Sequence, residues 1–169
     1  WLAWALILSA SYYASGMFGL ATPQVGGHVS LVWPPAGLAF AALVRLGPGL
    51  WPAIVLGALP VAMSTGVPLW AALLMAMGSA AGPAIAAEAM RRLGLHANLD
   101  RRQDLWLFGT GAAAATLFTA TNGVCWLVLG GAMPWASAPL AWSYWWLGDA
   151  MGVVVVGVVD GDGDGNGSR

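Results

Sequence analysis

Apolar residues run through the chain in long stretches, which polar or glycine- and proline-rich segments interrupt. A helix needs about 20 apolar residues to cross the bilayer core of roughly 30 Å, because it rises about 1.5 Å per residue. The predicted fold class is therefore all-α, a polytopic transmembrane helical bundle of about six spans. The expected spans are residues 1–20, 29–46 or 35–46, 50–63, 69–90, 104–129 and 142–159.

The second and third expected spans are short, since each would reach only about 20 Å as helix. Pro34, Pro35 and Pro60 interrupt regular helical hydrogen bonding. In lipid, a carbonyl freed by proline must find a partner inside the protein. These prolines indicate either packing against neighbouring helices or a polar cavity, although Pro34, Pro35 and Pro52 also suit the first turn of a helix.

Composition supports a membrane protein and excludes several other classes. Charged residues make up 8% of the 169 residues, against about 25% in soluble domains, and lysine is absent. The few arginines lie mostly at span ends, so we expect no nucleic-acid binding. The chain has no nucleotide-binding loop, no paired histidines at metal-binding spacing and no serine–histidine–aspartate set. We therefore expect no cofactor, no metal site and no enzymatic activity.

Arginines mark one side of the membrane. Apart from Arg169 in the tail, the arginines lie in two loops: Arg45 between the second and third spans, and Arg91, Arg92, Arg101 and Arg102 between the fourth and fifth. The loops 21–30 and 130–140 contain neither arginine nor lysine. With six alternating spans both basic loops fall on the same side, which the positive-inside rule makes cytoplasmic. Both termini are then expected in the cytoplasm.

Asp149 is the most informative residue within the spans. A carboxylate at the centre of a bilayer costs about 2.5–3.5 kcal/mol on insertion scales, so it normally faces protein or water and has a partner. Asp149 is expected to be a ligand contact, a protonation switch or a structural anchor. Gly148 and Gly152 flank it at a spacing that allows another helix to approach closely.

Asn122 is the second candidate, because it lies deep in the fifth span. Its amide could hydrogen-bond Asp149 across a helix interface, or it could simply join two helices. Trp33 and Trp146 are further candidates for ligand or signal contacts, although tryptophans also anchor helices at membrane interfaces. His28, in the outer loop, is either solvated or a contact for a ligand or a proton.

Glu88 precedes Arg91 and Arg92 by three and four residues, on one face of the fourth span. This spacing predicts a structural ion pair at the membrane interface.

Four stretches resemble the MASE1 family of bacterial membrane sensory domains. They are Ser30–Leu38 (SLVWPPAGL), Leu50–Ala58 (LWPAIVLGA), Ala120–Val124 (ATNGV) and Trp145–Gly152 (WWLGDAMG). The chain departs from the family pattern in the fourth span, where Ser79 and Gly82 replace an asparagine and a glutamate.

The resemblance implies a sensory domain over residues 1–159 in the bacterial inner membrane, followed by a flexible glycine–aspartate tail over 160–169 that is truncated or non-native. Such domains precede a cytoplasmic histidine kinase, diguanylate cyclase or cyclic-di-GMP phosphodiesterase. The expected partners are the lipid bilayer, a small molecule or membrane protein as ligand, and that cytoplasmic module. Association of two copies into a homodimer is a further possible partnership.

The leading hypothesis is thus a membrane sensor that signals through its last span. The alternative is a transporter or channel subunit, because transporters also use broken helices and intramembrane acids. An intramembrane enzyme ranks last, since Asp149 and Glu88 are the only acids well inside the spans and their expected depths differ.

Overall fold

The structure is a computed structural model that describes residues 1–21, 24–25, 29–30, 33–96 and 101–163. The helices are α1 (Leu2–Ala21), α2 (Pro34–Leu46), α3 (Trp51–Met63), α4 (Leu69–Arg92), α5 (Arg102–Leu129) and α6 (Ala138–Gly163), with short 3-10 turns η1 (Pro48–Leu50) and η2 (Trp135–Ser137). The all-α prediction is confirmed. Two-residue strands, β1 (Gln24–Val25) and β2 (Val29–Ser30), pair antiparallel between α1 and α2.

The six expected spans coincide with the six helices to within a few residues. α4 and α5 are long and apolar enough to cross a membrane. α2 and α3 have 13 residues each and are indeed short. α6 continues to Gly163, so the tail expected to be flexible from Asp160 begins as helix, and residues 164–169 lie outside the described part.

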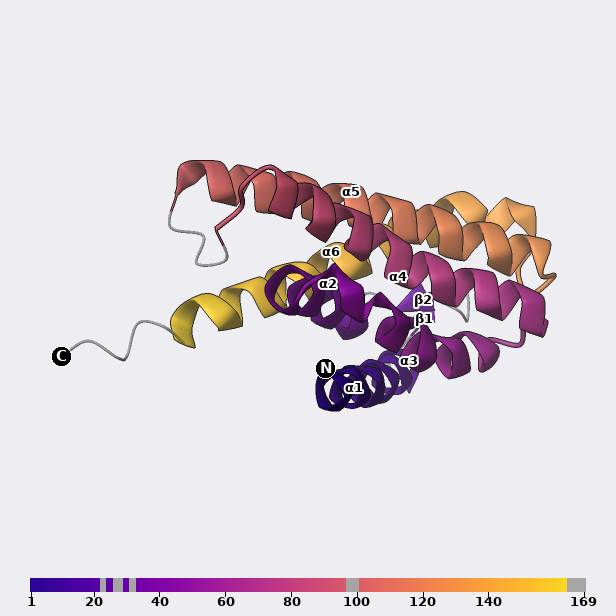
Figure 1. The fold of residues 1–169 in the computed structure, drawn as a ribbon. Helices are drawn as coiled ribbons and strands as arrows, with labels where there is room; N and C mark the ends of the chain where they lie inside the picture. The colour runs from indigo at the N-terminus through magenta and orange to yellow at the C-terminus, as the bar shows by residue number, and fades with distance from the viewer. Residues whose placement is uncertain (22–23, 26–28, 31–32, 97–100, 164–169) are drawn as a thin grey trace.

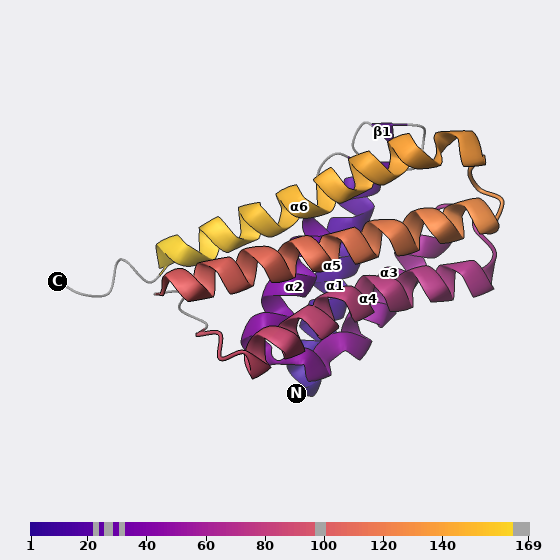
Figure 2. The same cartoon turned by 90° about the horizontal axis from the view of Figure 1, so that it is seen from above.

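The long helices α4, α5 and α6 run alongside one another (Figure 1), and α6 ends toward the same end of the molecule as the start of α5 (Figure 2). α4 packs against α3 and α5, while α6 packs against α2 and α5. α1 is seen nearly end-on in Figure 1, so it crosses the long helices steeply. That the short helices α2 and α3 and the steeply inclined α1 also span the bilayer therefore stays a prediction.

Small residues hold the helices close together. The buried face of α4 consists largely of alanine and glycine, which lets neighbouring backbones approach closely without a hydrophobic driving force. A Cβ atom on Gly78 would overlap the side chain of Asn122 on α5, and one on Gly111 of α5 would lie 2.8 Å from the Met90 sulfur. The glycine positions are thus required by packing between α4 and α5.

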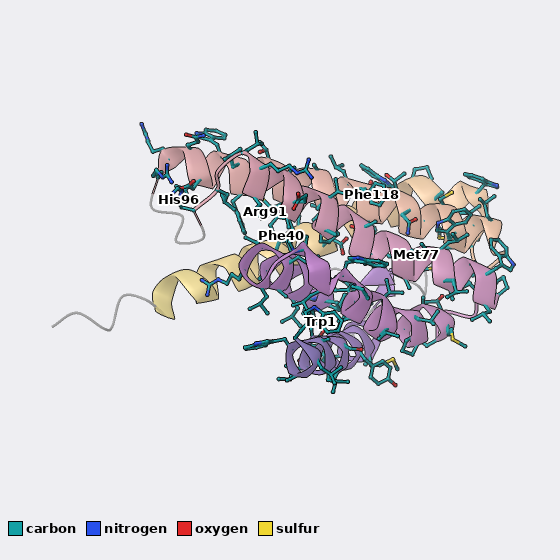
Figure 3. All side chains as sticks on the ribbon, viewed as in Figure 1. Trp1, Phe40, Met77, Arg91, His96 and Phe118 are labelled. Carbon is teal, nitrogen blue, oxygen red and sulfur yellow. The ribbon has the colours of Figure 1, made fainter. Side chains whose placement is uncertain are left out.

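The outer surface is apolar. Trp1, Met77 and Phe118 are 71%, 51% and 46% exposed, whereas Phe40 is buried at the centre (Figure 3). Large apolar side chains cover the outside of α1 and α4 in the same way. A soluble monomer rarely exposes so much contiguous apolar surface, and lipid tails solvate it well.

The prolines of α2 solve a hydrogen-bonding problem. The first four N–H groups of a helix have no partner within the helix. Pro34 and Pro35 occupy the first turn of α2 and lack N–H groups, while the Ala36 N–H donates to the Trp33 carbonyl. α2 can therefore begin inside the protein without a side-chain cap.

Candidate functional site

Asp149 lies midway along α6, with its side chain 1% exposed. The Thr119 hydroxyl on α5 lies in hydrogen-bond contact with Asp149 Oδ2. Asp149 Oδ1 is fully buried and has no hydrogen-bond partner among the described residues. One carboxylate oxygen is thus held by a neighbouring helix and the other is left unsatisfied, which is uncommon for a buried polar group.

A small cavity of about 20 Å³ adjoins Asp149. Four helices besides α6 contribute to its lining. The polar lining side chains are Tyr12, Ser79, Thr116 and Thr119, and the aromatic ones, in addition to Tyr12, are Trp33, Phe40 and Trp145. A second cavity of about 40 Å³ shares Tyr12, Trp33, Ser79 and Trp145 as walls, so the two adjoin. Among the described buried polar residues, Thr116, Thr119 and Asp149 therefore meet at one place, whereas Asp104 lies at the start of α5.

The start of α2 is fixed against α6 at this level. The Trp33 N–H donates to the Gly148 carbonyl at 3.2 Å, and a Cβ atom on Gly152 would overlap the Trp33 carbonyl oxygen. The Gly148–Gly152 pair does permit a close approach at Asp149, as its spacing predicts. What approaches is the backbone leading into α2.

This contact also sets the depth at which α2 begins. Gly152 is in the middle of α6, so α2 starts beside the middle of that helix rather than at its end. Farther along, Phe40 and Val153 belong to one buried cluster, on which Val44 packs. α2 therefore runs in the same direction as the second half of α6.

Tyr12 connects α1 to the site. It is 3% exposed, and its hydroxyl is hydrogen-bonded to Ser79 and to the Trp33 side chain. Because the Ser79 hydroxyl donates to the Met75 carbonyl at 3.1 Å, Tyr12 is the donor toward Ser79. Trp33 packs against Gly19 of α1 as well, so α1, α2 and α4 are joined at the cavity wall.

Asn122 does not supply the partner of Asp149. Its amide nitrogen donates to the Leu74 and Met75 carbonyls of α4, each at 3.3 Å, and its oxygen accepts from Trp126 Nε1 at 2.9 Å. The suggested Asn122–Asp149 bond is wrong, because Asn122 faces α4 beside Gly78 whereas Asp149 meets α5 at Thr119. Asn122 joins α4 to α5, the other interpretation of this residue.

The other candidate residues lie in different places. Trp33 lines both cavities. Trp146 lines neither, and stacks on Trp142 with ring centroids 6.1 Å apart, while its buried Nε1 lacks a partner among the described residues. Gly148 contributes its carbonyl to Trp33. His28 falls outside the described residues.

Glu88 forms the ion pairs that its spacing predicts. Its carboxylate contacts Arg91 at 2.8 Å and Arg92 at 2.6 Å on the exposed end of α4. The cluster lies away from the cavity and offers no polar contact to it.

Sequence reasoning missed Tyr12, Ser79, Thr116, Thr119 and Trp145. Thr116 and Thr119 had a signal, since two hydroxyls three residues apart share one face of an apolar helix. Tyr12 had none, because single hydroxyls occur throughout membrane helices and bond their own backbone. Ser79 had one, since it stands where the family pattern has an asparagine. Only the packing of helices distant in sequence brings them to Asp149.

Comparison with known protein families decides the identity. The family model named MASE1 matches residues 4–159, which cover nearly the whole chain. The chain belongs to the MASE1 family. MASE1 is a family of membrane-associated sensory domains, and membership supports a membrane sensory role without catalysis. No curated protein and no solved structure matches the chain.

The segments that carried the MASE1 resemblance meet at the site. Trp33 precedes the two prolines of one motif, and Gly148, Asp149 and Gly152 belong to another. These two motifs are joined by the Trp33–Gly148 hydrogen bond and by the contact at Gly152. The most specific sequence patterns of this MASE1 domain thus build a single structural feature.

Proposed function

We propose that this MASE1 domain detects a small molecule or a membrane partner at the cavity beside Asp149 and transmits the signal through α6 to a cytoplasmic output module. The observation that carries the proposal is the unsatisfied Oδ1 atom of Asp149, buried in a cavity on the helix that leads to the C-terminal end. A ligand that contacts this atom acts directly on α6.

The contacts of α6 explain how occupancy would be transmitted. α6 is held at Asp149 by Thr119 of α5 and at Gly148 and Gly152 by the lead-in to α2. A ligand shifts an equilibrium only as far as it binds one arrangement better than the other. Any ligand that competes with Thr119 for Asp149, or moves Trp33, meets this requirement, because it changes what holds α6 against its neighbours.

The proposed orientation places the arginine-rich end in the cytoplasm of a bacterium, with the chain crossing the inner membrane several times. Val44 packs on the same cluster as Leu95 and Phe108, so Arg45 lies near the end that carries Arg91 and Arg92. This arrangement supports the grouping of both basic loops on one side. α6 ends at that side too (Figure 2), where a histidine kinase, diguanylate cyclase or phosphodiesterase would receive the signal.

A reporter fusion tests the proposal. Residues 1–163 are joined to a diguanylate cyclase, and output per membrane-inserted protein is compared between wild type, Asp149→Asn and Glu88→Gln. Both substitutions turn a carboxylate into an amide, but only Asp149 lines the cavity. We expect Asp149→Asn to shift output several-fold and Glu88→Gln to leave it unchanged.

An unchanged output of Asp149→Asn at equal abundance would refute the proposal and make Asp149 a structural anchor. Transport is the second candidate, because α2 begins beside the middle of α6 next to a buried acid, as half-helices do in transporters. Flux of a small solute into vesicles that carry the chain alone would favour transport over sensing.

A further inference from the structure

When Asp149 is ionised, no described residue of the cavity compensates its negative charge. None of the described residues that line either cavity is basic. The described arginines Arg91 and Arg92 pair with Glu88, and Arg101 pairs with Asp104, all near the ends of α4 and α5. A water molecule could satisfy Oδ1 as an acceptor but could not neutralise the charge, and an unpaired buried charge is strongly destabilising.

The Ser79 and Thr116 hydroxyl groups that line the cavity can accept hydrogen bonds from a molecule inside it. A hydroxyl carries one proton and two lone pairs. Ser79 and Thr116 donate their protons to the backbone carbonyls of Met75 and Ala113, each at 3.1 Å. Tyr12 uses one lone pair of Ser79. The other lone pair of Ser79, those of Thr116 and Asp149 Oδ1 are left to accept hydrogen bonds from an occupant.

Pro83 interrupts the helical hydrogen bonding of α4 beside the cavity. It lies inside α4 and lines the cavity with Ser79, four residues earlier. Because proline has no N–H, the Ser79 carbonyl lacks its regular helical partner. The carboxylate and hydroxyl oxygens that line the cavity are acceptors, so its best occupant has several N–H donors and a positive charge.

The remaining walls favour an organic cation. Trp33, Phe40 and Trp145 line the cavity, and aromatic rings attract ammonium groups more strongly once water is excluded. Divalent cations prefer six or more oxygen ligands, which these apolar walls do not supply. A primary ammonium, with three N–H donors, matches Asp149 Oδ1, the hydroxyl oxygens of Ser79 and Thr116, and the aromatic surface together.

Size and access limit the ligand to a short one. The cavity at Asp149 holds about 20 Å³ and its neighbour about 40 Å³, where a single water needs about 10–15 Å³. Leu20 and Thr65, at the ends of α1 and α3, line the larger cavity. These ends lie opposite the arginine-rich loop along the helices, so a ligand would arrive from the outer side.

We propose that the cavity binds a small primary ammonium ion, with the cationic head against Asp149 Oδ1, Ser79 and Thr116 and a short apolar tail in the adjoining cavity. The proposal rests on the sensory function and names the chemical class of its ligand. Binding would neutralise the buried charge and strengthen the hold of α4 and α5 on α6.

Tryptophan fluorescence tests this binding, because Trp33 and Trp145 line the cavities. The purified chain in lipid nanodiscs is titrated with methylammonium chloride at constant ionic strength, with potassium as the balancing ion. We expect a saturable response in wild type and in Glu88→Gln, and at least tenfold weaker binding in Asp149→Asn. Tetramethylammonium, which has no N–H donor, should bind at least tenfold more weakly than methylammonium.

Thr65→Phe provides a second variant that does not alter the buried acid. It fills the wall of the larger cavity from a half-buried turn position, so it should weaken methylammonium binding several-fold even if Asp149→Asn fails to fold. No saturable response of wild type, or equal affinity for methylammonium in Asp149→Asn, would overturn the ligand class. So would equal affinity for tetramethylammonium.

The two proposals fail in different experiments. If the fusion responds to Asp149→Asn but the purified chain does not bind methylammonium, the sensory function stands and the ammonium ligand is wrong. If methylammonium binds through Asp149 but the output of the fusion changes with neither the ligand nor the substitution, the site exists and the sensory function is wrong.

Discussion

Replacing Gly152 by alanine tests the contact between α6 and the start of α2. Alanine is favoured over glycine within a helix by roughly 1 kcal/mol, so a glycine with space around it gains stability from the change. At Gly152 the new methyl group would overlap the Trp33 carbonyl oxygen. A backbone atom cannot move aside as a flexible side chain can, and overpacking costs about 1–3 kcal/mol.

Gly109→Ala is the matched control, since it makes the same chemical change within α5 and no atom lies within 4 Å of its added methyl group. We expect Gly109→Ala to stabilise the chain by about 0.5–1 kcal/mol. Gly152→Ala should be less stable than Gly109→Ala by about 1–3 kcal/mol, which is the steric cost alone.

The measurement is reversible unfolding of both variants in the same mixed micelles, followed by helical circular dichroism against denaturant. The comparison cancels the helix preference and isolates the contact. Equal stability of Gly152→Ala and Gly109→Ala would mean that α2 does not begin against the middle of α6.

Two further predictions concern the interior of α4 and α5. Thr119→Val removes the partner of Asp149 Oδ2 and should destabilise the chain by about 1–3 kcal/mol in denaturant unfolding. The control Thr110→Val changes an exposed hydroxyl bonded to its own helix and should alter stability by less than about 0.5 kcal/mol. Equal effects of the two substitutions would contradict the contact between Thr119 and Asp149. Gly78→Ala should strongly destabilise the fold, because its methyl group would overlap Asn122, but should be tolerated when Asn122→Ala is also present. A double-mutant cycle should then give a coupling free energy of about 0.5–3 kcal/mol. Purely additive effects would show that the two residues do not touch.

The helical fold could be predicted from the sequence because bilayer thickness fixes the length of a span. The long apolar runs that became α4 and α5 leave little choice of structure, and glycine–proline turns mark where the helices end. The direction of α2 could not be predicted in the same way. Whether a short proline-initiated helix starts at the surface or in the interior depends on its contact with Gly152, which lies far away in the sequence.

The candidate site was predictable only at its charged centre. Asp149 stands out because a carboxylate inside an apolar span is costly and needs a reason. Its partner did not stand out, since both Asn122 and Thr119 are polar residues of α5 within one turn of each other. The rotation of α5 decides between them, and that rotation follows from the packing of Gly78 on Asn122 and of Gly123 on Trp145.

The most direct test of signalling through α6 is the distance between α6 and α2 in the two states of the site. Spin labels are attached at Leu46 and Met151, which are 46% and 50% exposed, in a Cys125→Ser background. Pulsed electron spin resonance then compares wild type with Asp149→Asn. We expect the distance distribution to shift by about 1–2 Å or more, as in other helix movements at regulatory interfaces. An identical distribution in a variant whose reporter output has changed would contradict a signal carried by movement of α6 against α2.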